Sequence, residues 1–217
     1  MSSNKTVGPD VWPQPRVAVF IDGSNLYHSL EENCKRYDVN FSSFADRLCG
    51  KRTLYRIYYY NVVRDADRNP QAYQYQQKFL TALHNTPYLE VRLGSYKLRG
   101  DVAVEKGVDI MLATDLLRMA WDNVYDVAIL VSGDGDFAYA VQAVKNLGKH
   151  VEVAAFTSNL SGDLANIADS VQPLSLEYFA DLWSNKRTSA KSGSQGRSTQ
   201  RRGWRFGRFR KNGEGSD

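Results

Sequence analysis

The sequence VAVFIDGSN, residues 17–25, joins a short apolar run to an acidic residue and a turn-forming segment. Five consecutive apolar residues are typical of a buried strand, and Leu26, Tyr27 and Leu30 then recur at helical spacing. The sequence VAILVSGDGDF, residues 127–137, repeats this order of buried strand, small residues with carboxylates, and helix. The two stretches therefore predict two strand–turn–helix units of one sheet.

The chain around these stretches alternates between expected strands and expected helices. We expect further strands at residues 53–63, 88–98 and 151–156, helices at residues 41–48, 70–85, 108–121, 137–147, 160–168 and 176–183, and a polar connection at residues 99–107. Asn40 or Ser42 is the expected N-cap of the second helix, and Gly148 is the residue that ends the helix before it. This alternation predicts an α/β fold in which a mainly parallel sheet carries helices on both faces.

The positive charge of the protein is concentrated at one end of the sequence. The chain has 28 Lys and Arg against 24 Asp and Glu, and residues 185–217 hold ten of these basic residues and two of the acidic ones. We therefore expect three parts: a flexible lead-in at residues 1–15, one folded domain at residues 16–183, and a disordered basic tail at residues 184–217.

Several classes of protein are disfavoured by composition. Cys34 and Cys49 are too few for a disulfide framework, and the chain has no zinc-ligand spacing. It has no run of 18 apolar residues, no apolar segment behind a basic start and no phosphate-binding GxxxxGK[ST] loop. His28, His84 and His150 are widely separated, which disfavours a catalytic triad. We expect a soluble cytoplasmic protein without a membrane span.

Two of the predicted strands end in carboxylates, Asp22 and Asp134. Ligands of open parallel sheets bind at the carboxyl ends of strands, so these side chains face one another if the strands are neighbours. Adjacent carboxylates repel unless a cation neutralises them, and a site made only of oxygen atoms suits Mg²⁺ or Mn²⁺. Asp109, near the start of a helix, is a third available acid.

Each of these residues also has a purely structural interpretation. Asp22 and Asp136 are possible helix caps, Asp134 a possible tight-turn residue between glycines, and Asn25 an ordinary residue of a first helical turn. Asp115 lies about 120° around the helix from Asp109, so the two side chains cannot both point directly at one ion. We therefore expect Asp115 to support the site or to form a salt bridge.

Four sequence motifs, taken together, resemble one known family. FIDGSN at residues 20–25, EKGVDI at 105–110, DLL at 115–117 and LVSGDGDF at 130–137 are similar in order and spacing to the LabA-like branch of the NYN domain family, a group of PIN-like ribonucleases. The resemblance covers residues 16–175 and implies a three-layer α/β/α sandwich.

The same resemblance implies how the acidic residues are used. Asp22, Asp109 and Asp134 form the acidic metal cluster, Asp136 and Asn25 support it, and the activity is Mg²⁺- or Mn²⁺-dependent hydrolysis of RNA phosphodiester bonds. In this mechanism Asp22 and Asp134 are direct ligands, and Asp109 is a ligand or the base that orients water. Lys106 is a candidate for steadying phosphate oxygens, although a solvated lysine is the more ordinary interpretation.

The expected tail mixes arginines with aromatic residues, a composition suited to phosphate attraction and base stacking. The candidate RNA-binding residues are Arg201, Arg202, Trp204, Arg205, Phe206, Arg208, Phe209 and Arg210. The same composition also suits an anionic membrane surface or a purely solubilising tail. RNA is the favoured partner because the preceding domain already points to a phosphodiester substrate, and protein partners are a further possibility for the tail.

Three alternatives remain open from sequence. The first is a catalytically idle member of the same fold that acts as an RNA-binding or regulatory adaptor. The second is a haloacid dehalogenase-type phosphohydrolase, which the GDGD sequence at residues 133–136 suggests but which needs an acidic nucleophile where Phe20 stands. The third concerns assembly: Tyr58, Tyr59 and Tyr60 could pack a homodimer or simply the core.

Overall fold

The computed structural model describes residues 14–99 and 102–184. The strands are β1 (Arg16–Asp22), β2 (Thr53–Val62), β3 (Leu89–Arg99), β4 (Val102–Lys106), β5 (Val127–Val131), β6 (His150–Phe156) and β7 (Ser170–Leu174). The α-helices are α1 (Gly23–Cys34), α2 (Phe41–Cys49), α3 (Pro70–His84), α4 (Val108–Trp121), α5 (Ala138–Asn146) and α6 (Gly162–Ile167), and the short 3-10 turns are η1 (Gly135–Phe137) and η2 (Thr157–Asn159).

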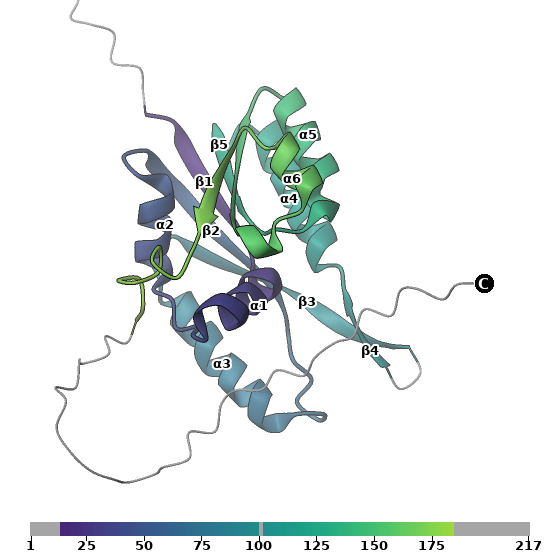
Figure 1. Ribbon diagram of the computed structural model, residues 1–217. Coiled ribbons are helices and arrows are strands. Elements are labelled where there is room, and N and C mark those ends of the chain that lie inside the picture. Colours follow the sequence, from purple (N-terminus) through teal and green to yellow (C-terminus); the bar gives the residue numbers. More distant parts are fainter. Residues whose placement is uncertain (1–13, 100–101, 185–217) are drawn as a thin grey trace, which may run out of the picture. The chain divides into compact units, whose positions relative to one another are not determined.

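The described strands form one sheet in the order β4-β3-β2-β1-β5-β6-β7 (Figure 1). Neighbouring strands are parallel except for β3 and β4, which form an antiparallel hairpin. The chain moves outward from β1 through β2 to β3, and then returns to place β5 on the other side of β1. The direction of winding therefore reverses between β1 and β5, which is where ligands bind in open α/β sheets.

The two faces of the sheet are covered by different helices, as expected for a three-layer sandwich (Figure 1). On β1, Val17, Val19 and Ile21 pack toward the layer that contains α1, α2 and α3. Ala18 and Phe20 pack toward the layer that contains α4, α5 and α6. Every apolar residue of β1 is fully buried, because alternate side chains of a central parallel strand enter both layers.

Local capping chemistry fixes several helix ends. The side chain of Asn40, rather than that of Ser42, caps α2 by accepting a hydrogen bond of 3.0 Å from the Ser43 backbone N–H. Gly148, after α5, has a left-handed φ of 77°, a conformation that glycine adopts without strain. Both observations agree with the signals in the sequence.

The structure corrects the sequence analysis in three places. Residues 102–106 form β4 instead of a polar connection, because they pair with the end of β3 in a hairpin. Residues 170–174 form the edge strand β7, which the polar sequence SVQPL did not indicate. Residues 176–181 form successive turns instead of a helix, and Trp183 then forms an isolated antiparallel bridge with Val39. Phe179 and Leu182 are buried against the α2 side of the core.

The three consecutive tyrosines of β2 belong to the core and do not form a dimer surface. Tyr58, Tyr59 and Tyr60 are all at most 4% exposed. Among the residues that the structure describes, no helix is long and apolar enough to cross a membrane. The predicted lead-in, up to residue 13, and the predicted tail, from residue 185, lie outside the described residues.

Candidate active site

Asp22 is the last residue of β1 and the N-cap of α1. Its Oδ1 accepts a hydrogen bond of 3.0 Å from the backbone N–H of Asn25, and the residue is 5% exposed. The next residue is Gly23, and a larger residue would not fit there, because a Cβ would lie 2.5 Å from the Tyr59 ring and 2.6 Å from the Tyr60 carbonyl oxygen. The close approach of α1 to β2 therefore requires glycine, and it holds the Asp22 carboxylate at the end of the strand.

The segment after β5 is equally constrained. A Cβ on Gly133 would lie 2.0 Å from the Asn159 carbonyl oxygen, and the Gly133 carbonyl accepts a hydrogen bond of 2.8 Å from the Ser161 N–H. Asp134 is half-buried and caps η1, since its Oδ1 accepts a hydrogen bond of 3.1 Å from the Asp136 N–H. The turn thus fixes Asp134 and leaves the Asp136 side chain exposed.

Ser132 and Asn25 connect the two strand ends. β1 and β5 pair in parallel with Ile21 opposite Val131, so the residues that follow each strand are neighbours. The buried Ser132 hydroxyl donates a hydrogen bond of 3.1 Å to Asp22 Oδ2 and accepts one of 3.2 Å from the Asp134 N–H. Asn25 Oδ1 accepts a hydrogen bond of 3.1 Å from the Gly133 N–H. Ser132 was not among the residues predicted from sequence, although a serine between a buried strand and a Gly-Asp pair is the pattern that could have identified it.

The electrostatics of this region are dominated by negative charge. Burial raises the pKa of Asp22 to about 7, and the negative charges of Asp109 and Asp134 raise it as well. The hydrogen bonds from Asn25 and Ser132 oppose this shift, because they favour the ionised carboxylate. Asp109 lies in the first turn of α4, and partial loss of solvent together with the charges of Asp134 and Asp136 raises its pKa. All four carboxylates therefore belong to one electrostatically coupled group around the ends of β1 and β5.

The donor chemistry of this group fits a hard divalent cation. Among the described side chains, no Lys, Arg or His forms an ion pair with Asp22, Asp109, Asp134 or Asp136. Oxygen atoms are the ligands that Mg²⁺ and Mn²⁺ prefer. Within residues 14–99 and 102–184, however, no group of three or more His, Cys, Asp or Glu side chains is arranged to hold a metal ion. The described carboxylates thus supply oxygen ligands, but three of them do not converge on one ion position.

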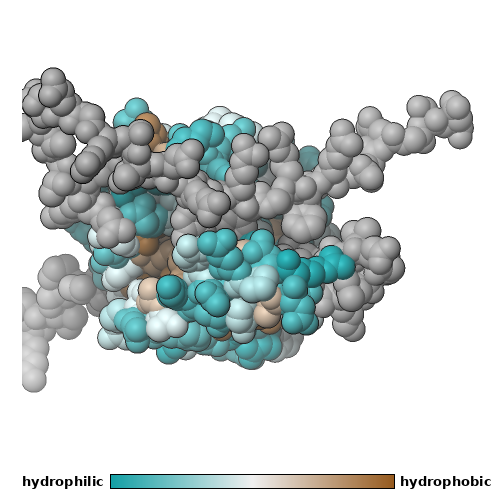
Figure 2. Space-filling model, turned by 90° about the horizontal axis from the view of Figure 1, so that it is seen from below, coloured by the Kyte–Doolittle hydropathy of each residue, from teal (hydrophilic) through white to brown (hydrophobic). Residues whose placement is uncertain are grey.

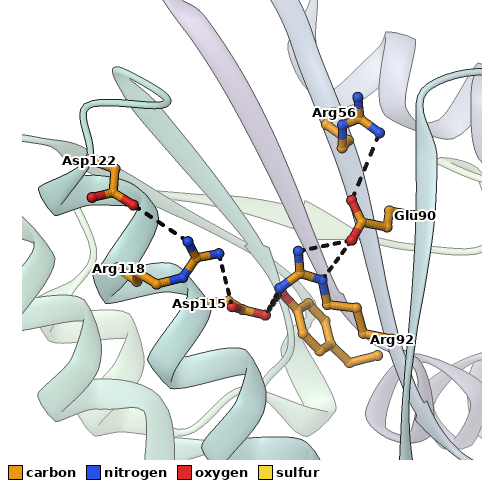
Figure 3. Close-up of polar contacts among 7 residues, drawn as sticks. Arg56, Glu90, Arg92, Asp115, Arg118 and Asp122 are labelled. Carbon is orange, nitrogen blue, oxygen red and sulfur yellow. Dashed lines mark hydrogen bonds and ion pairs between the residues drawn. The ribbon is translucent and has the colours of Figure 1, made fainter.

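Asp115 has a separate, structural environment (Figure 3). It is 7% exposed, forms an ion pair with Arg92, and accepts a hydrogen bond of 3.0 Å from the Tyr60 hydroxyl. The Arg92 guanidinium also lies 4.9 Å from the centre of the Tyr58 ring, and Arg118 approaches Asp115 to 3.7 Å. Asp115 therefore connects α4 to β2 and β3, in agreement with the expectation that it forms a salt bridge.

The predicted nucleic-acid contacts are not described by the structure. Lys106 is the last residue of β4, two residues before α4 begins, and the position of its side chain is not described. The arginines and aromatic residues predicted to bind RNA, from Arg201 to Arg210, lie outside the described residues. Figure 2 views the molecule from below, toward the side on which β1 ends, and the described surface there is mostly hydrophilic.

Comparisons with known proteins place this fold and these motifs in a family. The chain is 27% identical over 162 residues to the low amplitude and bright protein LabA of Synechococcus elongatus, which covers 71% of this chain and 81% of that protein. A stretch of 73 residues is 33% identical to an uncharacterized protein of Sinorhizobium fredii, over about a third of each chain.

A crystal structure of a protein of unknown function from Vibrio parahaemolyticus has the same fold. It superposes with a TM-score of 0.62 at 23% sequence identity, over 80% of this chain and 96% of the other. The NYN domain family matches residues 16–176, which include both strand ends and all four carboxylates. The chain belongs to the NYN domain family.

Proposed function

We propose that this protein is a metal-dependent ribonuclease that hydrolyses RNA phosphodiester bonds at the ends of β1 and β5. The observation that carries the proposal is the buried Asp22 carboxylate, whose pKa is raised in part by the charges of Asp109 and Asp134. None of these three residues has a basic partner among the described side chains. A protein gains nothing in stability from holding like charges together at a sheet edge. Such an arrangement is expected where a cation and a phosphate complete the site.

In this proposal each residue has a defined task. Asp22 and Asp134 hold the divalent ion. Two carboxylates suffice for Mg²⁺, because this ion is usually bound by one or two carboxylates, with waters and phosphate oxygens in its other positions. A bound Mg²⁺ or Mn²⁺ supplies an activated water and stabilises the charge that develops on the phosphoryl oxygens. Asp109, exposed and with a raised pKa, completes the ligand set or orients the attacking water and takes its proton.

The remaining residues support this arrangement. Asn25 fixes the Gly133 backbone through its side-chain oxygen, and Asp136 adds negative charge on the exposed side of the group. We further propose that Lys106 contacts phosphate oxygens and that the basic residues from Arg201 to Arg210 bind RNA. Homodimer formation, protein partners of the tail and a cytoplasmic location stay predictions from sequence.

One structural observation favours the adaptor alternative. The carboxylates of Asp22 and Asp134 each cap a helical turn, so both have a structural role that needs no metal ion. An NYN fold that kept these residues only as caps would bind RNA without cleaving it.

Cleavage of labelled single-stranded, hairpin and duplex RNA distinguishes the two functions. The intact protein is compared with Asp22→Asn combined with Asp134→Asn, in Mn²⁺, in Mg²⁺ and in EDTA. Asp46→Asn is the matched control, since Asp46 is an exposed residue of α2. Metal-dependent cleavage that the double variant loses and the control keeps supports the ribonuclease. RNA that is bound but stays intact in every condition supports the adaptor.

A further inference from the structure

An exposed aromatic ring lies directly beside the proposed active site. Tyr139 is 85% exposed, whereas Phe137, two residues earlier, is buried. The backbone continues from η1 into α5 without a break, since Phe137 and Ala138 both have right-handed helical φ and ψ angles. Tyr139 therefore follows Asp136 by one helical turn on the same exposed face, a spacing at which side chains are neighbours.

A second exposed apolar residue borders the same carboxylates. Ile110 is 73% exposed and follows Asp109 at the start of α4. α4 packs against α5, the helix that continues from η1, so the first turn of α4 and the η1 turn lie on neighbouring elements. The exposed Asp109 is thus followed by Ile110 on α4, and the exposed Asp136 of η1 is followed by Tyr139 on α5.

This pairing of acid and apolar surface limits how RNA can be held at the site. Asp136, one turn before Tyr139, is negatively charged and repels phosphate groups, so attraction there has to come from the ion or from contacts that need no charge. Stacking of a nucleobase on an aromatic ring is such a contact, and every base has a face that can use it. Bases in a duplex are stacked on one another and are inaccessible to a side chain, whereas unpaired bases are accessible.

We propose that the Tyr139 ring stacks on an unpaired base next to the scissile phosphate, with Ile110 contacting a neighbouring base, and thereby selects single-stranded RNA. This inference rests on the proposed ribonuclease function and names the feature of the substrate that the site recognises. Tyr139 is then a specificity residue that contacts substrate, and it takes no part in the chemistry of hydrolysis.

Binding is measured by fluorescence anisotropy of the full chain in EDTA, with a labelled oligoadenylate and with an abasic oligomer of the same length. Because the abasic oligomer keeps the phosphates and lacks the bases, it reports charge-driven binding alone. Tyr139→Ala should weaken oligoadenylate binding about tenfold, the usual effect of losing one stacked base, and should leave abasic binding unchanged. Tyr139→Phe should bind as the wild type does, and Tyr139→Leu as Tyr139→Ala does.

Tyr88→Ala is the matched control. Tyr88 is 68% exposed but precedes the first residue of β3, at the opposite end of the parallel strands from the carboxylates. Unchanged oligoadenylate affinity in Tyr139→Ala overturns the inference, as does an equal loss for both oligomers. Sedimentation of the same variants tests whether this face instead forms a contact between copies of the chain, because Ile110, Leu117 and Trp121 lie along one side of α4. A dimer that Tyr139→Ala dissociates, with RNA affinity intact, makes the face a contact between copies of the chain.

Cleavage kinetics separate this inference from the proposed function. If RNA is cut in Mn²⁺ and Tyr139→Ala raises KM for single-stranded RNA about tenfold at unchanged kcat, both stand. If RNA is cut with the same KM by wild type and Tyr139→Ala, the ribonuclease stands and the stacking position is wrong. If no RNA is cut but oligoadenylate binding depends on the ring, the ribonuclease is wrong and the base contact stands.

Discussion

Asp22→Asn should stabilise the metal-free protein at neutral pH. Burial raises the pKa of Asp22 from 3.8 to about 7, so the folded protein opposes ionisation of this carboxylate more strongly than the unfolded chain does. The shift of about three pH units corresponds to about 4 kcal/mol, because one unit is worth about 1.4 kcal/mol. Asparagine keeps the size and the capping oxygen of aspartate and carries no charge.

The sign of the effect follows from the direction of the shift. Below about pH 4 Asp22 is protonated in both states, and its contribution to stability is fully present. As the pH rises toward 7 the unfolded chain ionises first, and this contribution is lost. The advantage of Asp22→Asn should therefore be near zero at about pH 4 and grow to as much as about 4 kcal/mol by about pH 8.

Urea unfolding in EDTA at several pH values measures this difference directly, with Asp46→Asn as the control for a lost surface charge. Adding Mn²⁺ should then favour the wild type, since a ligand at about 100 times its Kd adds about 2.7 kcal/mol to the stability of the state that binds it. A stability difference that does not change with pH, or a variant that is less stable than the wild type at about pH 8, would refute the assignment of Asp22 as a buried, destabilised carboxylate.

Three further substitutions test the frame that holds the site. Gly133→Ala should destabilise the fold by more than 3 kcal/mol in urea unfolding, because its Cβ would lie 2.0 Å from a backbone carbonyl; Gly162→Ala, with open space around it, should be neutral or slightly stabilising. Arg92→Ala should lower the free energy of unfolding by about 3 kcal/mol, because the Asp115 carboxylate stays buried without its closest cation. Adding Asp115→Asn to this variant should recover much of the loss, and equal stability of the single and double variants would contradict this reasoning. Ser132→Ala should cost about 2 kcal/mol, because one buried and one half-buried hydrogen bond are lost. It should also raise the pKa of Asp22 further and move the midpoint of the pH–rate profile to higher pH, since the serine hydroxyl favours the ionised carboxylate; an unmoved midpoint would contradict the positioning role of the serine.

The elements that sequence predicted well are those with strong local patterns. The apolar runs that became β1 and β5 are short, rich in Val and Ile and followed by Gly, which favours buried strands of a central sheet, and caps such as Asn40 define helix ends by their own chemistry. The turns around Asp22 and Asp134 follow from the same local rules, which is why the sequence located both carboxylates.

The elements that sequence missed depend on partners distant in the chain. β7 has a polar sequence that includes Pro173, which is tolerated because β7 is an edge strand of the described sheet and, among the described strands, pairs with β6 alone. The role of Ser132 depends on the pairing of β1 with β5, which brings its hydroxyl to Asp22, 110 residues earlier in the chain. Likewise Tyr139 is conspicuous only once its exposure beside Asp136 is known.

We propose that the carboxylates around Asp22 hold a metal ion with which the protein cleaves RNA. Single-turnover cleavage of one single-stranded RNA, followed as Mn²⁺ is added, tests it most directly for the wild type, Asp22→Asn, Asp134→Asn and Asp46→Asn. We expect the cleavage rate to saturate with Mn²⁺ in the wild type and in Asp46→Asn, and to fall at least a hundredfold in the other two variants. Equal rates in all four proteins, or no cleavage by the wild type at any Mn²⁺ concentration, would contradict it.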